Sequence, residues 1–177
     1  MLASEQELFS SCEEVLMKRY GPVDMQSDIM PWSHSDYYVA EMGDGLQRRF
    51  ISLEQLGNPD LLPLMKREMI ELEKQWSILA HGTECRRINI DPGYLTEAKV
   101  VLATTKDFAH RLYIGENIYA EVELTYRKDR QGFVTLEHTY PDYRNSQTIE
   151  WFNRAREILR KSLLLKNEMK NDRRVAP

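Results

Sequence analysis

The sequence predicts an α+β fold, in which a mostly antiparallel sheet packs against helices within a single domain. Its length of 177 residues fits one domain. Apolar residues recur at helical spacing near residues 4–20, 61–80 and 146–165. Between residues 85 and 138 the apolar period changes to two, and short loops join consecutive strands, which makes neighbouring strands antiparallel.

The first predicted helix covers about residues 4–20. Ser4 and Glu7 have the spacing of a capping box, in which the two side chains satisfy free amides at the start of a helix. Cys12 lies on the apolar stripe and is expected in the core, as free cysteines usually are. Residues 22–46 are rich in Pro and Gly and are expected to be irregular.

A second helix is expected over about residues 61–80, ended by Gly82. The face opposite its apolar stripe carries Lys66 and Arg67 and is assigned to solvent. The stripe consists of residues spaced three and four apart: Leu62, Met65, Met69, Leu72, Trp76 and Leu79.

A hairpin is expected around a three-residue loop, Gly115 to Asn117. The Arg111–Glu121 pair in this hairpin is either a plain ion pair, worth under about 1 kcal/mol if exposed, or part of a binding site. The simplest register gives three cross-strand pairs: Ile114–Ile118, Tyr113–Tyr119 and Arg111–Glu121.

The last helix is expected to begin near Ser146, so that residues 1–165 form the domain and residues 166–177 a flexible, mildly basic tail. Two cysteines, Cys12 and Cys85, exclude a disulfide framework and favour a cytoplasmic protein. The formal net charge of −4 argues against a general nucleic-acid binder. The chain has no apolar run of the roughly 18 residues that a membrane span needs.

The densest polar region lies between residues 86 and 111, and its convergent cations suit an anion such as a phosphate or carboxylate. Asp91-Pro92-Gly93-Tyr94 has the pattern of a type II turn, which would present Asp91 and Tyr94 rigidly. His110 and Asp91 are the candidate acid–base groups. The competing interpretation is a set of structural ion pairs. The candidate anion ligands are Arg87, Lys106 and Arg111.

Two other loops combine aromatic and charged residues that suit stacking and hydrogen bonding to a base or sugar, although they equally suit aromatic plugs over a small core. Metal ligands are weakly supported, since neither His34 to Asp36 nor His81 to Cys85 matches a zinc pattern. No metal or cofactor is therefore predicted. The residues of these loops are Asp36, Tyr37, Tyr38, Glu41, Arg48 and Arg49 in the first, and Thr139 to Arg144, with Asp142 and Tyr143, in the second.

Six segments, in this order, resemble domain-of-unknown-function family 4416, an uncharacterised prokaryotic family of similar length, over nearly the whole chain up to about residue 156. The resemblance implies no particular reaction. It implies that twelve residues lie in family motifs: Tyr37, Tyr38, Glu41, Arg49, Asp91, Tyr94, Lys106, His110, Arg111, Glu121, Asp142 and Tyr143. It also implies a short strand before the first helix, and we expect the chain start to be truncated or misassigned upstream of Met1. The segments are residues 35–43, 89–95, 101–106, 110–113, 118–122 and 139–143.

The sequence leaves three functional hypotheses open. The first is a protein that binds an anionic small molecule, phosphorylated or nucleotide-like, with Tyr38 or Tyr143 stacking on it; catalysis is not required by these residues. The second is a non-catalytic interaction or structural module. The third is RNA binding, which the acidic balance disfavours. The oligomeric state is not predicted.

Overall fold

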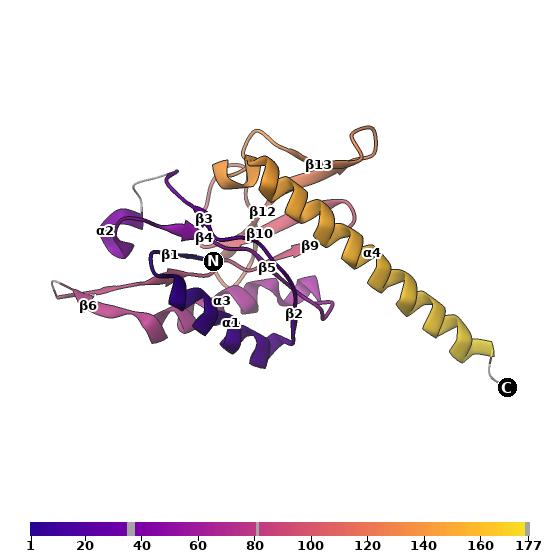
Figure 1. Cartoon of the computed structure of the whole chain (residues 1–177), viewed down its shortest axis with the longest axis horizontal. Coiled ribbons are helices and arrows are strands. Elements are labelled where there is room, and N and C mark those ends of the chain that lie inside the picture. The colour runs from indigo at the N-terminus through magenta and orange to yellow at the C-terminus, as the bar shows by residue number, and fades with distance from the viewer. Residues whose placement is uncertain (35–37, 81, 176–177) are drawn as a thin grey trace. The chain divides into compact units, whose positions relative to one another are not determined.

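The computed structural model of this chain describes residues 1–34, 38–80 and 82–175 (Figure 1). Helices combine with several antiparallel sheets, so the predicted α+β class is confirmed. In chain order the elements are β1 (Leu2–Ala3), α1 (Gln6–Tyr20), β2 (Val23–Gln26), β3 (Met30–Pro31), α2 (Val39–Met42), β4 (Gln47–Arg48), β5 (Ile51–Leu53), η2 (Pro59–Leu61), α3 (Leu62–Glu73), η3 (Lys74–Trp76), β6 (Ile78–Ala80), β7 (Thr83–Cys85), β8 (Ile88–Asn89), β9 (Gly93–Leu95), β10 (Lys99–Thr104), β11 (Leu112–Gly115), β12 (Ile118–Arg127), β13 (Gly132–Thr135), η4 (Pro141–Arg144) and α4 (Ser146–Val175).

The chain divides into two compact units. Unit 1 consists of Met1–Tyr94 and Val101–Glu121, and unit 2 consists of Leu95–Val100 and the chain from Val122 onward. Strands β10 and β12 each contribute residues to both units. Within the described residues, no helix is long and apolar enough to cross a membrane.

A four-stranded sheet in unit 1 has the order β3-β4-β1-β8. Strand β1 is central and pairs antiparallel with β4 on one side and β8 on the other. A short apolar strand therefore does precede the first helix, and it is formed by Leu2–Ala3, both fully buried. The expectation that the chain start is truncated or misassigned stays a prediction.

Helix α1 packs on α3 through Phe9, Cys12 and Leu16, which are buried with Met69 and Leu72. Burial raises the pKa of the Cys12 thiol to about 12, which keeps it protonated and unreactive at neutral pH.

The predicted capping box at the start of α1 is wrong. The N-cap is Glu5, whose side chain makes no capping bond. The Ser4 hydroxyl donates instead to the carbonyl of Met42, 3.4 Å away. Ser4 therefore bonds to a residue that is distant in the sequence, and not to the helix amide that the capping-box pattern predicts.

The second predicted helix is too long at its C-terminal end. Helix α3 ends at Glu73, one 3₁₀ turn follows, and residues 78–80 form β6, which pairs with β7. Leu79, expected in the core, is 79% exposed in this ribbon. An extended strand points alternate residues to opposite faces, so the helical stripe ends where the backbone becomes extended.

Residues 22–46, expected to be irregular, contain β2, β3 and α2, and that prediction is wrong. Strand β2 pairs with β5 and strand β3 with β4. The paired residues are far apart in the chain, as Val23 with Leu53 and Met30 with Arg48 show, and strands this short have no recognisable period. Tertiary pairing, rather than local periodicity, determines these elements.

The larger sheet has the order β11-β12-β10-β9, with β13 also paired to β12. The predicted Tyr113–Tyr119 pair is confirmed. Gly115, rather than Ile114, pairs with Ile118, because Glu116 and Asn117 both adopt positive φ and form a two-residue turn.

The predicted type II turn at Asp91–Tyr94 is wrong, because Gly93 begins β9 and has no positive φ. The close approach of a neighbouring strand explains the glycine: a Cβ at Gly93 would lie 2.3 Å from the carbonyl oxygen of Val101. The glycine is needed here for space rather than for backbone conformation.

In unit 2, α4 begins at Ser146 as predicted and holds β13 through Asn153, which accepts from the amide of Phe133 at 2.9 Å. Arg156 lies over the ring of Tyr126 at 3.5 Å and donates to the carbonyl of Glu97. The helix continues through residues 166–175, which the sequence analysis assigns to a tail. The domain boundary at residue 165 stays a prediction.

Candidate functional site

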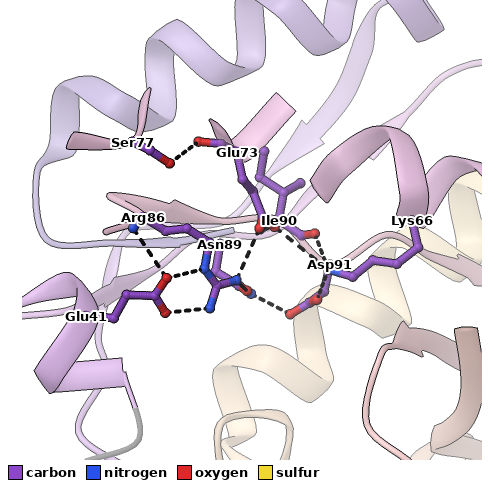
Figure 2. Close-up of polar contacts among 8 residues, drawn as sticks. All are labelled: Glu41, Lys66, Glu73, Ser77, Arg86, Asn89, Ile90 and Asp91. Carbon is purple, nitrogen blue, oxygen red and sulfur yellow. Dashed lines mark hydrogen bonds and ion pairs between the residues drawn. The ribbon is translucent and has the colours of Figure 1, made fainter. Parts of the chain in front are cut away.

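A buried polar network in unit 1 joins α3, α2 and the chain on either side of β8 (Figure 2). Lys66 and Glu73 come from α3, Glu41 from α2, and Arg86 precedes β8. We call this set the Lys66–Arg86 network. Its members are Glu41, Lys66, Glu73, Arg86, Asn89 and Asp91.

Lys66 forms the buried end of the network, with only 3% of its surface exposed. Its ammonium donates to the carbonyl of Ile90 at 2.9 Å and to Asp91 Oδ1 at 2.6 Å. The assignment of Lys66 to a solvent face is therefore wrong. Residues 62, 66, 69 and 73 lie on one helix face, so Lys66 shares the inward side of α3 with Leu62 and Met69.

Charge interactions keep Asp91 ionised. Burial by itself raises the pKa of this carboxyl, but the Lys66 ammonium outweighs it and brings the pKa down to about 2. Asn89 donates to the other carboxylate oxygen at 2.7 Å. A carboxylate so strongly stabilised is a weak base, so these contacts favour an anchoring role for Asp91.

Glu73 links the two cations of the network. Its Oε1 accepts from the amide of Ile90 at 2.7 Å and lies 3.8 Å from Lys66 Nζ, while Oε2 lies 3.1 Å from Arg86 Nη1. Burial raises the pKa of Glu73, against the effect of Lys66. Glu73 is 1% exposed and is a permanent internal partner for Arg86.

Arg86 is bound on two sides (Figure 2). Behind it, Nη1 donates to Glu73 Oε2 and, at 3.0 Å, to Asn89 Oδ1. On its outer edge, Nε and Nη2 each donate to one oxygen of Glu41 at 2.7 Å. The hydrogen bonds between the two side chains raise the pKa of Arg86 and lower that of Glu41. Both side chains are partly exposed, at 28% and 30%.

Tyr38 and Lys106 lie beside the same short helix. Tyr38 is the N-cap of α2 and is three residues before Glu41, so the two share one side of the turn. The Lys106 ammonium is 5.5 Å from the centre of the Tyr38 ring, and Trp32 packs edge-on against that ring. Of the residues predicted from the sequence, Glu41 contacts Arg86 directly, and Asp91 is linked to Arg86 only through Asn89. Lys106 and Tyr38 contact each other at the start of α2.

A second cluster surrounds Glu121. One of its oxygens lies 2.9 Å from His110 Nε2 and 3.0 Å from Arg111 Nε. Arg111 also donates to the carbonyl of Lys106 and lies over the ring of Phe108. The Arg111–Glu121 pair predicted from the hairpin register is present, but both side chains are 2% exposed, so the small energy of an exposed pair does not apply.

The remaining candidates are matched locally or lie apart from these clusters. Arg49 pairs with Glu13 at 2.7 Å, and Arg87 pairs with Glu5. Tyr94 is half-buried in β9. Asp142 and Tyr143 are buried in η4 of unit 2. Asp36, Tyr37 and His81 lie outside the described residues.

Four residues of the network are not among the site residues predicted from the sequence: Lys66, Glu73, Arg86 and Asn89. The signal for the first two was present, because a Lys and a Glu occupy the inward face of an otherwise apolar helix stripe. Nothing local distinguishes Arg86 from Arg87. Over the described ranges, no group of three or more His, Cys, Asp or Glu side chains is placed to hold a metal ion.

Comparison with protein families gives one match: the family model described as Domain of unknown function (DUF4416) covers residues 1–159. Comparisons with curated proteins and with solved structures gave no match.

Proposed function

The chain belongs to this family of unknown function, and since the family description assigns no activity, we propose from the contacts that unit 1 binds an anionic small molecule, phosphorylated or nucleotide-like, beside α2. The observation that carries the proposal is the geometry of Arg86. A buried carboxylate and an amide hold its Nη1, and the Nε–Nη2 edge faces a carboxylate at 2.7 Å.

Arg86 is prepared for a two-oxygen anion. A guanidinium presents parallel N–H donors that match carboxylate and phosphate oxygens. Because Glu73 and Asn89 hold the group from behind, its orientation does not depend on what binds at the outer edge. An orientation set in advance reduces the entropy lost on binding.

Lys106 and Tyr38 support the same ligand class. The Lys106 ammonium adds positive charge beside α2, and the Tyr38 ring over which it lies is of the kind that stacks on a base or sugar, if a ligand displaces the ammonium from it. The proposal is for binding and does not require a reaction. Acid–base roles for His110 and Asp91 remain predictions, and the contacts of these two residues belong to different clusters.

One observation favours the alternative of an interaction module. Phe108, Leu112 and Tyr113 are 54%, 74% and 61% exposed within a stretch of six residues. Exposed large apolar side chains can mark a protein contact, although Leu112 and Tyr113 are consecutive in β11 and point to opposite faces of that strand. This alternative predicts that polar substitutions of the three residues abolish binding to a protein partner and leave the binding of small anions unchanged.

The test is titration of the purified protein with ATP, GTP, a sugar phosphate and inorganic pyrophosphate. Calorimetry measures the affinity, and thermal unfolding measures the stabilisation. A ligand present at 100 times its Kd stabilises the folded state by about 2.7 kcal/mol. Arg86→Lys keeps the positive charge that Glu73 needs but removes the fork, so we expect binding to weaken at least about tenfold. Arg127→Gln, which changes an exposed pair in unit 2, should bind as the wild type does. Equal affinities for wild type and Arg86→Lys, or no binding of any probe at millimolar concentration, would refute the proposal.

A further inference from the structure

We infer that Glu41 is an internal competitor of the ligand: its carboxylate occupies the edge of Arg86 that an incoming anion needs, and it must leave before the anion binds. This inference rests on the proposed function, because it concerns the same edge of the same residue. It adds a residue that lowers affinity, rather than one that contributes to it.

The hydrogen bonds of Arg86 support exchange. A guanidinium has five N–H groups, one on Nε and two on each terminal nitrogen. Four of these groups have the partners described: Nη1 donates to Glu73 and Asn89, and the Nε–Nη2 edge donates to the two oxygens of Glu41. The second N–H of Nη2 offers an anion a single hydrogen bond and not a paired contact. An anion that bonds this edge through two oxygens occupies the positions that the Glu41 oxygens hold. The ligand therefore replaces Glu41 rather than binding beside it.

The charges of the network support the same conclusion. Its two cations, Lys66 and Arg86, face three carboxylates, Glu41, Glu73 and Asp91. An added anion with Glu41 still in place would oppose two cations with four anions, and like charges this close repel strongly. An anion that replaces the Glu41 carboxylate brings one negative charge fewer to the network than the same anion bound beside Glu41.

Glu41 is also the carboxylate that is able to leave. Its side chain is 30% exposed, whereas Glu73 is 1% exposed and cannot reach water. Helix α2 does not depend on Glu41 alone, because Met42 is buried with Leu2 and Trp32. A rotation of the Glu41 side chain into solvent therefore frees the Arg86 edge without unfolding α2.

The size of the effect follows from the contact to be broken. A hydrogen bond to a charged group contributes roughly 1.5–3 kcal/mol. If the Arg86 edge is free only a small fraction of the time, the apparent Kd is the intrinsic Kd divided by that fraction. We therefore expect removal of the Glu41 carboxylate to tighten binding at least about tenfold, which corresponds to about 1.4 kcal/mol.

The experiment is calorimetric titration of the full chain with inorganic pyrophosphate, comparing wild type with Glu41→Gln and Glu41→Ala. Glu71→Gln is the matched control, because Glu71 pairs with Lys74 on the exposed side of α3. Thermal unfolding of each variant establishes that it is folded, and Glu41→Asp, which keeps the charge but shortens the side chain, replaces any variant that is not. Tighter binding by the Glu41 variants, with Glu71→Gln unchanged, supports the inference.

The failures of the two proposals are distinguishable. If wild type binds pyrophosphate and the Glu41 variants bind equally well or more weakly, the competitor role is overturned while the anion site stands. If neither wild type nor any Glu41 variant binds, the anion site itself is wrong. If only the Glu41 variants bind, the competitor role is supported while the proposed function of the wild-type chain is overturned, since its own carboxylate then keeps the edge of Arg86 occupied.

Discussion

Replacing Lys66 by Met tests the core of the site. Lys66 is buried between Asp91 and Glu73. Its removal leaves Asp91 without its closest cation and leaves Glu73 with Arg86 alone. Breaking a buried pair in this way typically costs about 3–5 kcal/mol. The exposed Lys74, which begins η3 and pairs with Glu71 of α3, provides the control: Lys74→Met should leave the unfolding midpoint unchanged.

The pKa of Asp91 gives an independent value for how much this ion pair stabilises the fold. It falls from 3.8 to about 2 on folding, and each unit corresponds to about 1.4 kcal/mol, so ionised Asp91 stabilises the fold by about 2 kcal/mol. Because the folded-state pKa is the lower one, this stability is present above pH 3.8 and is lost as the pH falls toward 2. We expect the difference in the free energy of unfolding between wild type and Lys66→Met to decrease by a similar amount as the pH falls from 3.8 toward 2.

Urea unfolding at several pH values, followed by fluorescence and circular dichroism, measures both effects. The midpoint should shift while the slope stays constant, which indicates a change in stability alone. The reasoning would be refuted if Lys66→Met lowered the free energy of unfolding by less than about 1 kcal/mol at neutral pH. It would also be refuted if this loss did not change as Asp91 is protonated.

Three other predictions test the fold. Gly93→Ala should destabilise the protein by more than about 2 kcal/mol, because its new Cβ would meet the Val101 carbonyl oxygen at 2.3 Å; an unchanged melting temperature would contradict this. Arg111→Met should cost about 3–5 kcal/mol in chemical unfolding, and the double change with Glu121→Leu should recover most of that loss; additive costs would show that the pair is not coupled. Leu79→Ser should leave the melting temperature unchanged, since this side chain is 79% exposed; a large decrease would restore the helical interpretation of this segment.

Several features of the fold could be predicted because they depend on local pattern. The start of the last helix at Ser146 and the Tyr113–Tyr119 pair are confirmed. Hairpin register follows from the turn and the alternation of side chains, which are both local. The loop itself differed by one residue, because Glu116 and Asn117 take a two-residue turn.

The site was less predictable, because its chemistry depends on distant partners. The helical spacing puts Lys66 on the same face as Leu62 and Met69, but only Asp91, 25 residues later, explains why an ammonium is buried there. Arg86 and Arg87 are neighbours, yet Arg86 is held by buried Glu73 and Arg87 by partly exposed Glu5. No spacing rule distinguishes such adjacent residues before the chain is folded.

The amino-acid sequence alone determined the α+β class, the family and the residues in which charge and aromatic side chains are concentrated. These properties follow from composition and short-range periodicity, which each segment carries by itself. Only the tertiary structure decided which cations are buried and which carboxylate neutralises each one. It also decided that Glu41 occupies the partly exposed edge of Arg86. The physical reason is that burial and pairing are properties of two segments at once, so they exist only when the folded chain brings those segments together.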